Sequence, residues 1–237
     1  MLYIFLIICI FMRNPLAFVM GMLVFYVGIL LLIPIAIHGS QRYRLSRTSW
    51  RGIHFGYRGD LREFIKLYLG HGFLTLITFG IYGAWFRVKM REYIYGHTRF
   101  GNIEFKFVGN GGDLFLIRLK GIFLSIITLG VYLFWFYKEL AEFEFKNIKM
   151  IQNGEEINMR TSFTAGTIFE MIIVNYIIIL FSFGLATGVA INRFMRSAFE
   201  NIEFDRAIDP ETLMQTEEEY KDATGDDLAG MLDVSIV

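Results

Sequence analysis

The fold is decided by a stretch that occurs twice, first as Leu76-Ile77-Thr78-Phe79-Gly80-Ile81-Tyr82-Gly83-Ala84-Trp85-Phe86 and again as Ile126-Ile127-Thr128-Leu129-Gly130-Val131-Tyr132-Leu133-Phe134-Trp135-Phe136. Gly80 and Gly130 are fifty residues apart, and a weaker copy, Phe181-Ser182-Phe183-Gly184-Leu185, follows with its glycine fifty-four residues later. Self-similarity at a nearly fixed spacing is typical of a fold built from copies of one unit. We therefore predict three units, over residues 47–100, 101–152 and 158–208.

Each unit is expected to contain a strand, a glycine-rich turn, a capped helix, a glycine break and a second helix. Strands are predicted at residues 50–57, 103–107 and 202–204, because large apolar and small or polar residues alternate there with a period of two. The expected N-caps, whose side-chain oxygens can accept from free backbone N–H groups, are Asp60, Asp113 and Thr167. The expected helix breaks are Gly80, Gly130 and Gly184.

The composition indicates a membrane protein. Hydrophobic residues make up 54% of the 237 residues and the mean hydropathy is +0.46, which is high for a soluble domain. Four apolar stretches come near the roughly 20 residues that cross a bilayer: residues 16–37, 67–86, 121–137 and 171–191. A fifth, residues 2–12, is too short to cross alone. We predict a mainly α membrane protein, a helical bundle of internal repeats with a small cytoplasmic β-sheet formed by the linkers.

Charge divides the chain into a basic body and an acidic tail. From Asp205 onward ten acidic residues accompany two basic ones, a net charge of −8, so the body before it carries +8. We expect N-terminal membrane segments over residues 1–40, a repeat-built membrane domain over 41–208, and a mobile, cytoplasmic acidic tail over 209–237. The tail opens on Asp209-Pro210-Glu211, which predicts a cap and a first helical turn.

Two topologies are open for the apolar stretches. If each crosses once, each side of the membrane receives eleven Lys and Arg residues, whereas the positive-inside rule normally leaves one side poorer. If each instead turns back at its Thr/Ser-(Phe/Leu)-Gly word, every unit is a helical hairpin with both ends in the cytoplasm. The hairpin is favoured because all strands could then meet in one sheet.

Three phrases carry a resemblance to a known family: Arg42-Tyr43-Arg44-Leu45, Trp50-Arg51-Gly52-Ile53-His54-Phe55, and Ile77-Thr78-Phe79-Gly80-Ile81-Tyr82 with Trp85. Over roughly residues 40–205 the chain resembles the bacterial YjgN family, DUF898. The resemblance implies a multi-pass protein of the bacterial inner membrane without an established activity. Family members usually carry another unit ahead of the region matching Leu16, so a shortened member or a truncated gene model is expected.

Few polar residues fall inside the apolar stretches. His71 and Asn175 occupy the same offset before their glycines and are candidate intramembrane polar positions, either bonding between helices or marking a substrate or proton path. Expected anchors at the headgroup level are two tryptophans and three cations: Trp85, Trp135, Arg87, Lys89 and Lys138.

No catalytic constellation is visible in the sequence. The single cysteine, Cys9, excludes an intramolecular disulfide, and no two histidines have the helical spacing of a metal site. We predict no catalytic residue, cofactor, metal or nucleic-acid partner. A membrane scaffold or assembly factor is the first hypothesis, a transporter or channel using the helix breaks is the alternative, and a lipid-modifying enzyme is the third. Expected partners are membrane lipids and, for a scaffold, other membrane proteins or a second copy of the chain.

Overall fold

The computed structural model describes residues 15–216, so the apolar stretch at residues 2–12 and the tail beyond Thr216 lie outside the described residues. The described chain begins with one long helix, α2 (Pro15–Ser46), of 32 residues, about 48 Å at 1.5 Å per residue. Its segment Phe18–Ser46 is the only helix in the described part that is long and apolar enough to cross a membrane. The expected domain boundary at residue 40 lies inside this helix.

A seven-stranded antiparallel sheet follows α2, with its strands in sequence order. The strands are β1 (Ser49–Trp50), β2 (Ile53–Tyr57), β3 (Thr98–Phe100), β4 (Ile103–Phe107), β5 (Ile148–Gln152), β6 (Glu155–Thr161) and β7 (Ile202–Phe204). Tight turns join β1 to β2, β3 to β4 and β5 to β6. Their residues take positive φ, as at Gly52 (79°), Gly101 (53°) and Gly154 (85°), which glycine adopts at little cost.

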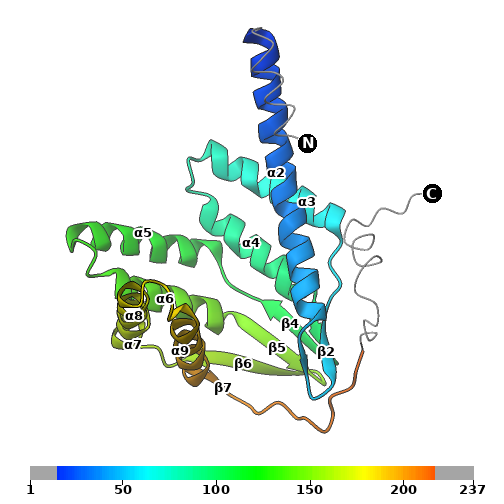
Figure 1. The fold of residues 1–237 in the computed structure, drawn as a ribbon. Helices are drawn as coiled ribbons and strands as arrows, with labels where there is room; N and C mark the ends of the chain where they lie inside the picture. The colour runs from blue at the N-terminus through cyan, green and yellow to red at the C-terminus, as the bar shows by residue number, and fades with distance from the viewer. Residues whose placement is uncertain (1–14, 217–237) are drawn as a thin grey trace.

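The other three connections are helical hairpins. Hairpin 1 is α3 (Leu61–Ile77) and α4 (Gly83–Gly96), hairpin 2 is α5 (Gly111–Ile127) and α6 (Leu133–Lys146), and hairpin 3 is α7 (Ala165–Phe169), the π-helical turn η1 (Glu170–Val174), α8 (Asn175–Phe181) and α9 (Thr187–Glu200). Because tight turns and hairpins alternate along an antiparallel meander, all three hairpins leave from one end of the sheet and all three tight turns lie at the other. α2 leaves from the hairpin end, and the hairpins fan outward beside it (Figure 1).

The prediction of a membrane-crossing helical bundle with a small linker sheet is wrong. Among the described helices only α2 meets the length and apolarity that a crossing needs. The apolar stretches at residues 67–86, 121–137 and 171–191 each contain a reversal. The arms of the hairpins have 14 to 17 residues, fewer than the roughly 20 residues required. The reversals agree with the hairpin alternative, whereas the position of the hairpin ends relative to a membrane stays a prediction.

The helix caps lie earlier than predicted in two of the three hairpins. Asp60 caps α3, accepting from the Glu63 N–H at 2.8 Å, which confirms that prediction. The prediction of Asp113 and Thr167 as N-caps is wrong, because the caps are Asn110 and Thr164, three residues before them. The glycines between cap and predicted cap already belong to the helix, since glycine in a first turn costs little when tertiary packing supports the helix.

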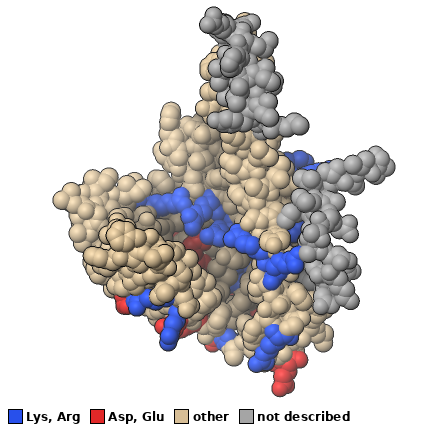
Figure 2. Space-filling model, viewed as in Figure 1, with Lys and Arg blue, Asp and Glu red and all other residues tan. Residues whose placement is uncertain are grey.

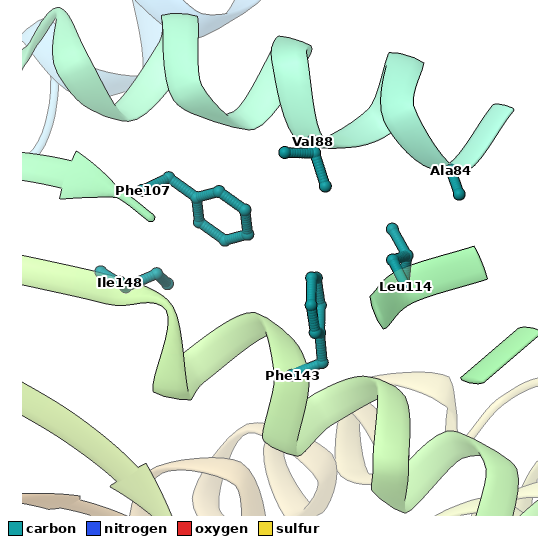
Figure 3. Close-up of a cluster of buried hydrophobic side chains, with 6 residues drawn as sticks. All are labelled: Ala84, Val88, Phe107, Leu114, Phe143 and Ile148. Atoms are coloured by element: carbon teal, nitrogen blue, oxygen red, sulfur yellow. The ribbon is translucent and has the colours of Figure 1, made fainter. Parts of the chain in front are cut away.

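The core lies where hairpins 1 and 2 meet the sheet. Its buried side chains are Ala84, Val88, Phe107, Leu114, Phe143 and Ile148. Figure 3 shows Val88 on α4 and Phe143 on α6 facing one another, with Phe107 and Ile148 entering from the sheet. Two hairpins are therefore held in a fixed relation by shared apolar burial rather than by the chain connection alone.

The first part of the acidic tail docks on the sheet. Residues 208–216, called here the docked segment, place Ile208 and Leu213 against the buried side chains of Phe100, Ile103, Met150 and Ile157. The docked segment crosses the tight-turn end of the sheet (Figure 1), where it is hydrogen-bonded to His54, Gly101, Asn102 and Gln152. The Glu211 N–H donates to the Asp209 carboxylate at 3.0 Å, but residues 209–216 form no helix, in contrast to the predicted helical turn.

Candidate functional site

The three hairpin tips share one hydrogen-bonded turn. At the first tip the Gly80 N–H donates to the Thr75 carbonyl at 2.8 Å, and the Phe79 N–H donates to the Leu76 carbonyl at 3.1 Å, the Schellman pattern that ends a helix. The Thr78 hydroxyl oxygen accepts from the Tyr82 N–H at 3.0 Å and so helps to start the next helix. The other two tips repeat these contacts around Thr128-Leu129-Gly130 and Ser182-Phe183-Gly184. The predicted breaks at Gly80, Gly130 and Gly184 lie in these turns.

The residue before each tip glycine combines an unfavourable backbone with an exposed apolar side chain. Phe79, Leu129 and Phe183 have φ of 50°, 51° and 50°, a left-handed conformation that costs a non-glycine residue about 1–2 kcal/mol. Their exposed fractions are 97%, 95% and 96%. Glycine is the usual residue at this position of the turn. These side chains contribute almost nothing to the core, so folding of the described chain does not account for them.

Around each tip the hairpin is apolar and free of charge. Asp, Glu, Lys and Arg are absent from residues 67–86, 121–137 and 171–192. Large apolar side chains on the outer faces of the arms are exposed: Phe73, Leu76 and Ile77 on α3, Leu119, Phe123 and Ile126 on α5, and Tyr176, Leu180 and Phe181 on α8. Exposed apolar surface on this scale marks contact with lipid or protein.

The two predicted intramembrane polar residues lie on different hairpins. The His71 Nδ1 of α3 lies 2.9 Å from the Tyr82 hydroxyl, so that contact closes hairpin 1 from within. Asn175, at the start of α8, is buried, and its amide donates to the Met171 carbonyl at 2.7 Å. Asn175 Oδ1 has no hydrogen-bond donor among the described residues, and it follows the π-helical turn η1, a feature that often accompanies function. The structure does not bring these two residues into one site.

The predicted anchors take more specific contacts than a belt at the headgroup level requires. Trp85 is half-buried and packs its ring on Phe115 of hairpin 2, with ring centroids 5.4 Å apart. Trp135 is about half exposed and stacks on Tyr132. The three cations are paired with carboxylates: Lys89 with Glu92, Lys138 with Glu142, and Arg87 with Glu144 of the other hairpin.

A cluster of three arginines lies between hairpins 1 and 2. Arg87 and Arg91 of α4 lie 2.6 and 3.1 Å from the two carboxylate oxygens of Glu144 on α6. Arg118 of α5 reaches across to the start of α4, since its Nη1 would lie 3.9 Å from a Cβ added to Gly83. Burial and the nearby Arg87 lower the pKa of the Arg118 guanidinium, whereas Glu144 raises it. We call these four charged residues the arginine cluster.

The cluster was missed by sequence reasoning for a clear reason. Arg87 and Glu144 are 57 residues apart, so their pairing depends on how two hairpins pack. A signal did exist in Arg118 and Lys120, which stand in the otherwise apolar run of α5. Lys120 instead pairs within hairpin 2, 2.6 Å from Glu139. Figure 2 shows Lys and Arg gathered in a band that runs between the uncharged surfaces of the hairpins.

The described residues offer no metal site, because no group of three or more His, Cys, Asp or Glu side chains converges among residues 15–216. Open, mainly apolar grooves run along the hairpins. One is lined by Leu30 of α2 together with Tyr68, Gly72, Phe73 and Phe86 of hairpin 1. A second runs over Leu116, Leu119 and Phe123 of α5. Neither includes His71 or Asn175 in its lining.

Comparison with known proteins gives one match. The family model described as "Bacterial protein of unknown function (DUF898)" matches residues 1–107 and 71–119 of this chain. No curated protein matches the chain. No solved structure matches it either.

Proposed function

We propose that the chain, which belongs to DUF898, a family of bacterial proteins of unknown function, is a scaffold of the bacterial inner membrane. In this proposal α2 anchors the protein in the membrane, and the three hairpin tips enter one leaflet. Phe79, Leu129 and Phe183 carry this proposal. Each is an almost fully exposed apolar side chain in a backbone conformation that glycine would adopt at less cost. Lipid contact supplies the reason for an apolar side chain there, because burying it in the bilayer is worth about 1.5–3 kcal/mol.

The lengths of the charge-free tips support entry into one leaflet. Arg87 is the first charged residue after tip 1, seven residues beyond Gly80, or about 10 Å along a helix. Lys120 is the last one before tip 2, ten residues ahead of Gly130, or about 15 Å. Half of the hydrocarbon core is also about 15 Å. The tips can therefore enter one leaflet while the charges stay at the level of the headgroups.

The polarity of the sheet supports one membrane-facing end. α2 and the three hairpins leave from the same end, and the docked segment crosses the other. On this arrangement the sheet and the acidic tail lie together in the cytoplasm, and the lipids are the partners of the hairpin end. Each N-cap lies twenty residues before its tip glycine, which supports descent of the three hairpins from one repeated unit.

Site-specific fluorescence quenching tests the proposal. A Phe79→Cys variant in a Cys9→Ala background, labelled with an environment-sensitive dye, is reconstituted in vesicles that contain lipids brominated on their acyl chains. The matched control is Glu156→Cys, an exposed residue near the tight-turn end of the sheet. We expect strong quenching at position 79 and little at position 156. Equal quenching at the two positions would refute entry of the tip into lipid.

A second set of variants separates insertion from folding. Replacing Phe79, Leu129 and Phe183 together by Gly relieves the left-handed strain, so the folded chain in detergent should unfold at a similar or higher temperature. A dye on Ile81→Cys should nevertheless be quenched less by brominated lipid in this variant than with the native tips.

The transporter alternative receives no comparable support, since His71 hydrogen-bonds within its own hairpin and lines neither groove described above.

A further inference from the structure

The arginine cluster holds more positive charge than its own carboxylate can neutralise. Arg87 and Arg91 contact Glu144, and Arg118 lies near enough for the charges of Arg87 and Glu144 to shift its pKa, so the four side chains carry a formal net charge of +2. Arg118 forms no ion pair within 4.0 Å among the described residues, although it is half-buried. A half-buried guanidinium loses hydration and needs an anionic partner to recover it.

The geometry of the carboxylate reinforces this point. The Glu144 side chain is 15% exposed, and Arg87 donates to its Oε1 at 2.7 Å. Arg91 Nε lies 3.1 Å from Oε2, but it is not aligned to donate, and that oxygen accepts no hydrogen bond. Two of the three guanidiniums therefore keep most of their N–H donors available for another acceptor.

We propose that the arginine cluster binds a phosphate group, and that in the membrane this group is the phosphodiester of an anionic phospholipid. Guanidinium groups present pairs of parallel N–H donors that match phosphate oxygens, and basic pockets between helices are known to receive lipid headgroups. Apolar surface on which an acyl chain can rest adjoins the cluster: Ile122 of α5 is exposed and follows Arg118 by four residues, on the same face of the helix. The choice of a lipid rests on the proposed function, whereas binding of phosphate by the cluster does not.

The same arrangement assigns a role to Glu144. It holds Arg87 and Arg91 in place, yet its charge competes with an incoming anion. Removal of that charge in Glu144→Gln should therefore strengthen phosphate binding, whereas removal of a guanidinium in Arg118→Gln should weaken it. The loss of a charge-assisted hydrogen bond corresponds to a weakening of roughly tenfold or more.

Binding is measured on the full chain in an uncharged detergent, by native mass spectrometry and by the shift in unfolding temperature. The probes are dioctanoyl phosphatidylglycerol, dioctanoyl phosphatidylcholine and inorganic phosphate. We expect phosphatidylglycerol to bind and to raise the unfolding temperature more than the zwitterionic lipid does. An equal effect of inorganic phosphate would support the phosphate site and identify free phosphate as its ligand.

Three variants decide whether the cluster is the site. Arg118→Gln should weaken binding by roughly tenfold, and Glu144→Gln should strengthen it. The matched control is Arg193→Gln, an arginine of hairpin 3 that pairs with Glu170 at 3.0 Å and is about as exposed as Arg87; it should leave binding unchanged. No binding of any anionic probe, or an equal loss in Arg193→Gln, overturns the proposal. If Arg118→Gln does not fold, Arg87→Gln and Glu144→Gln must still shift affinity in opposite directions.

These readouts are independent of membrane entry by the tips. Short-chain lipid in detergent can occupy the cluster without a bilayer, so a failure of the quenching experiment would leave the phosphate site standing. Conversely, quenching of the tips with no anion binding would keep the membrane scaffold and remove the phosphate site.

Discussion

Truncation of Leu114 tests the orientation of hairpin 2. Leu114 is 0% exposed and lies in the core between α4, α6 and the sheet. Leu114→Ala removes three buried carbons, worth about 2.4 kcal/mol at about 0.8 kcal/mol each. A cavity term of about 24 cal/mol per Å³ of unfilled space brings the expected loss of unfolding free energy to about 3–4 kcal/mol. Denaturant unfolding in detergent, followed by tryptophan fluorescence, measures this loss.

Leu116→Ala is the matched control, because it removes the same atoms two residues further along α5, from the exposed face of the helix. It is 62% exposed, so Leu116→Ala should change the unfolding free energy by less than about 1 kcal/mol. The gain in helix propensity is the same in both variants and cancels in the comparison. If Leu116→Ala costs as much as Leu114→Ala, or if Leu114→Ala costs less than about 1 kcal/mol, the orientation of α5 against the core is wrong.

Three further outcomes are expected. Gly111→Ala should cost about 1–3 kcal/mol of unfolding free energy by overpacking, because the added Cβ would lie 2.9 Å from the Trp85 Cα, a backbone atom; thermal unfolding would show this loss, and an unchanged midpoint would argue against the contact. Truncation after Thr216 should leave the unfolding midpoint unchanged, whereas a truncation that also removes the docked segment should lower it. Hydrogen bonds from Asn158 lower the pKa of Asp205 in the folded chain. The ionised carboxylate therefore stabilises the fold above its pKa in the unfolded chain, about 3.9, and this stabilisation is lost as the pH falls from there through the lower folded-state pKa. Asp205→Asn should therefore be less stable than the native chain at pH 7, and a stability difference that persists unchanged at pH 3 would contradict this.

Local features of the fold could be predicted from the sequence. The reversal at Thr78-Phe79-Gly80 depends only on neighbouring residues, because its hydrogen bonds join residues 75 to 82 of one chain segment. The cap at Asp60 is local in the same way. Asn153-Gly154 was a further local signal: it forms the tight turn between β5 and β6, and this dipeptide between alternating residues is a strong predictor of a β-hairpin.

Features that depend on packing between distant segments could not be predicted. Hydropathy places the apolar stretches in a membrane-embedded helical bundle because it records only that a residue avoids water. An exposed Phe123 and a buried Leu114 are alike on that measure. The seven-stranded sheet needs partners such as Phe55 with Phe100, which the whole of hairpin 1 separates along the chain. The arginine cluster forms only where α4 packs against hairpin 2, so predicting it requires the packing of two hairpins as well as their separate structures.

The meander also explains how one motif can produce a molecule with two different ends. In an antiparallel sheet whose connections alternate between tight turns and helical hairpins, every hairpin must leave from the same end, whatever the number of strands. The three apolar tips therefore lie at the same end of the sheet whatever the other residues are. The tight-turn end stays free of hairpins, and the docked segment binds there. The sheet ends in two short edge strands, β1 and β7. A strand–hairpin–strand unit added at either edge would pair with the sheet and present its tip at the same end. The apolar hairpin end can therefore grow by repetition while all hairpins keep one direction.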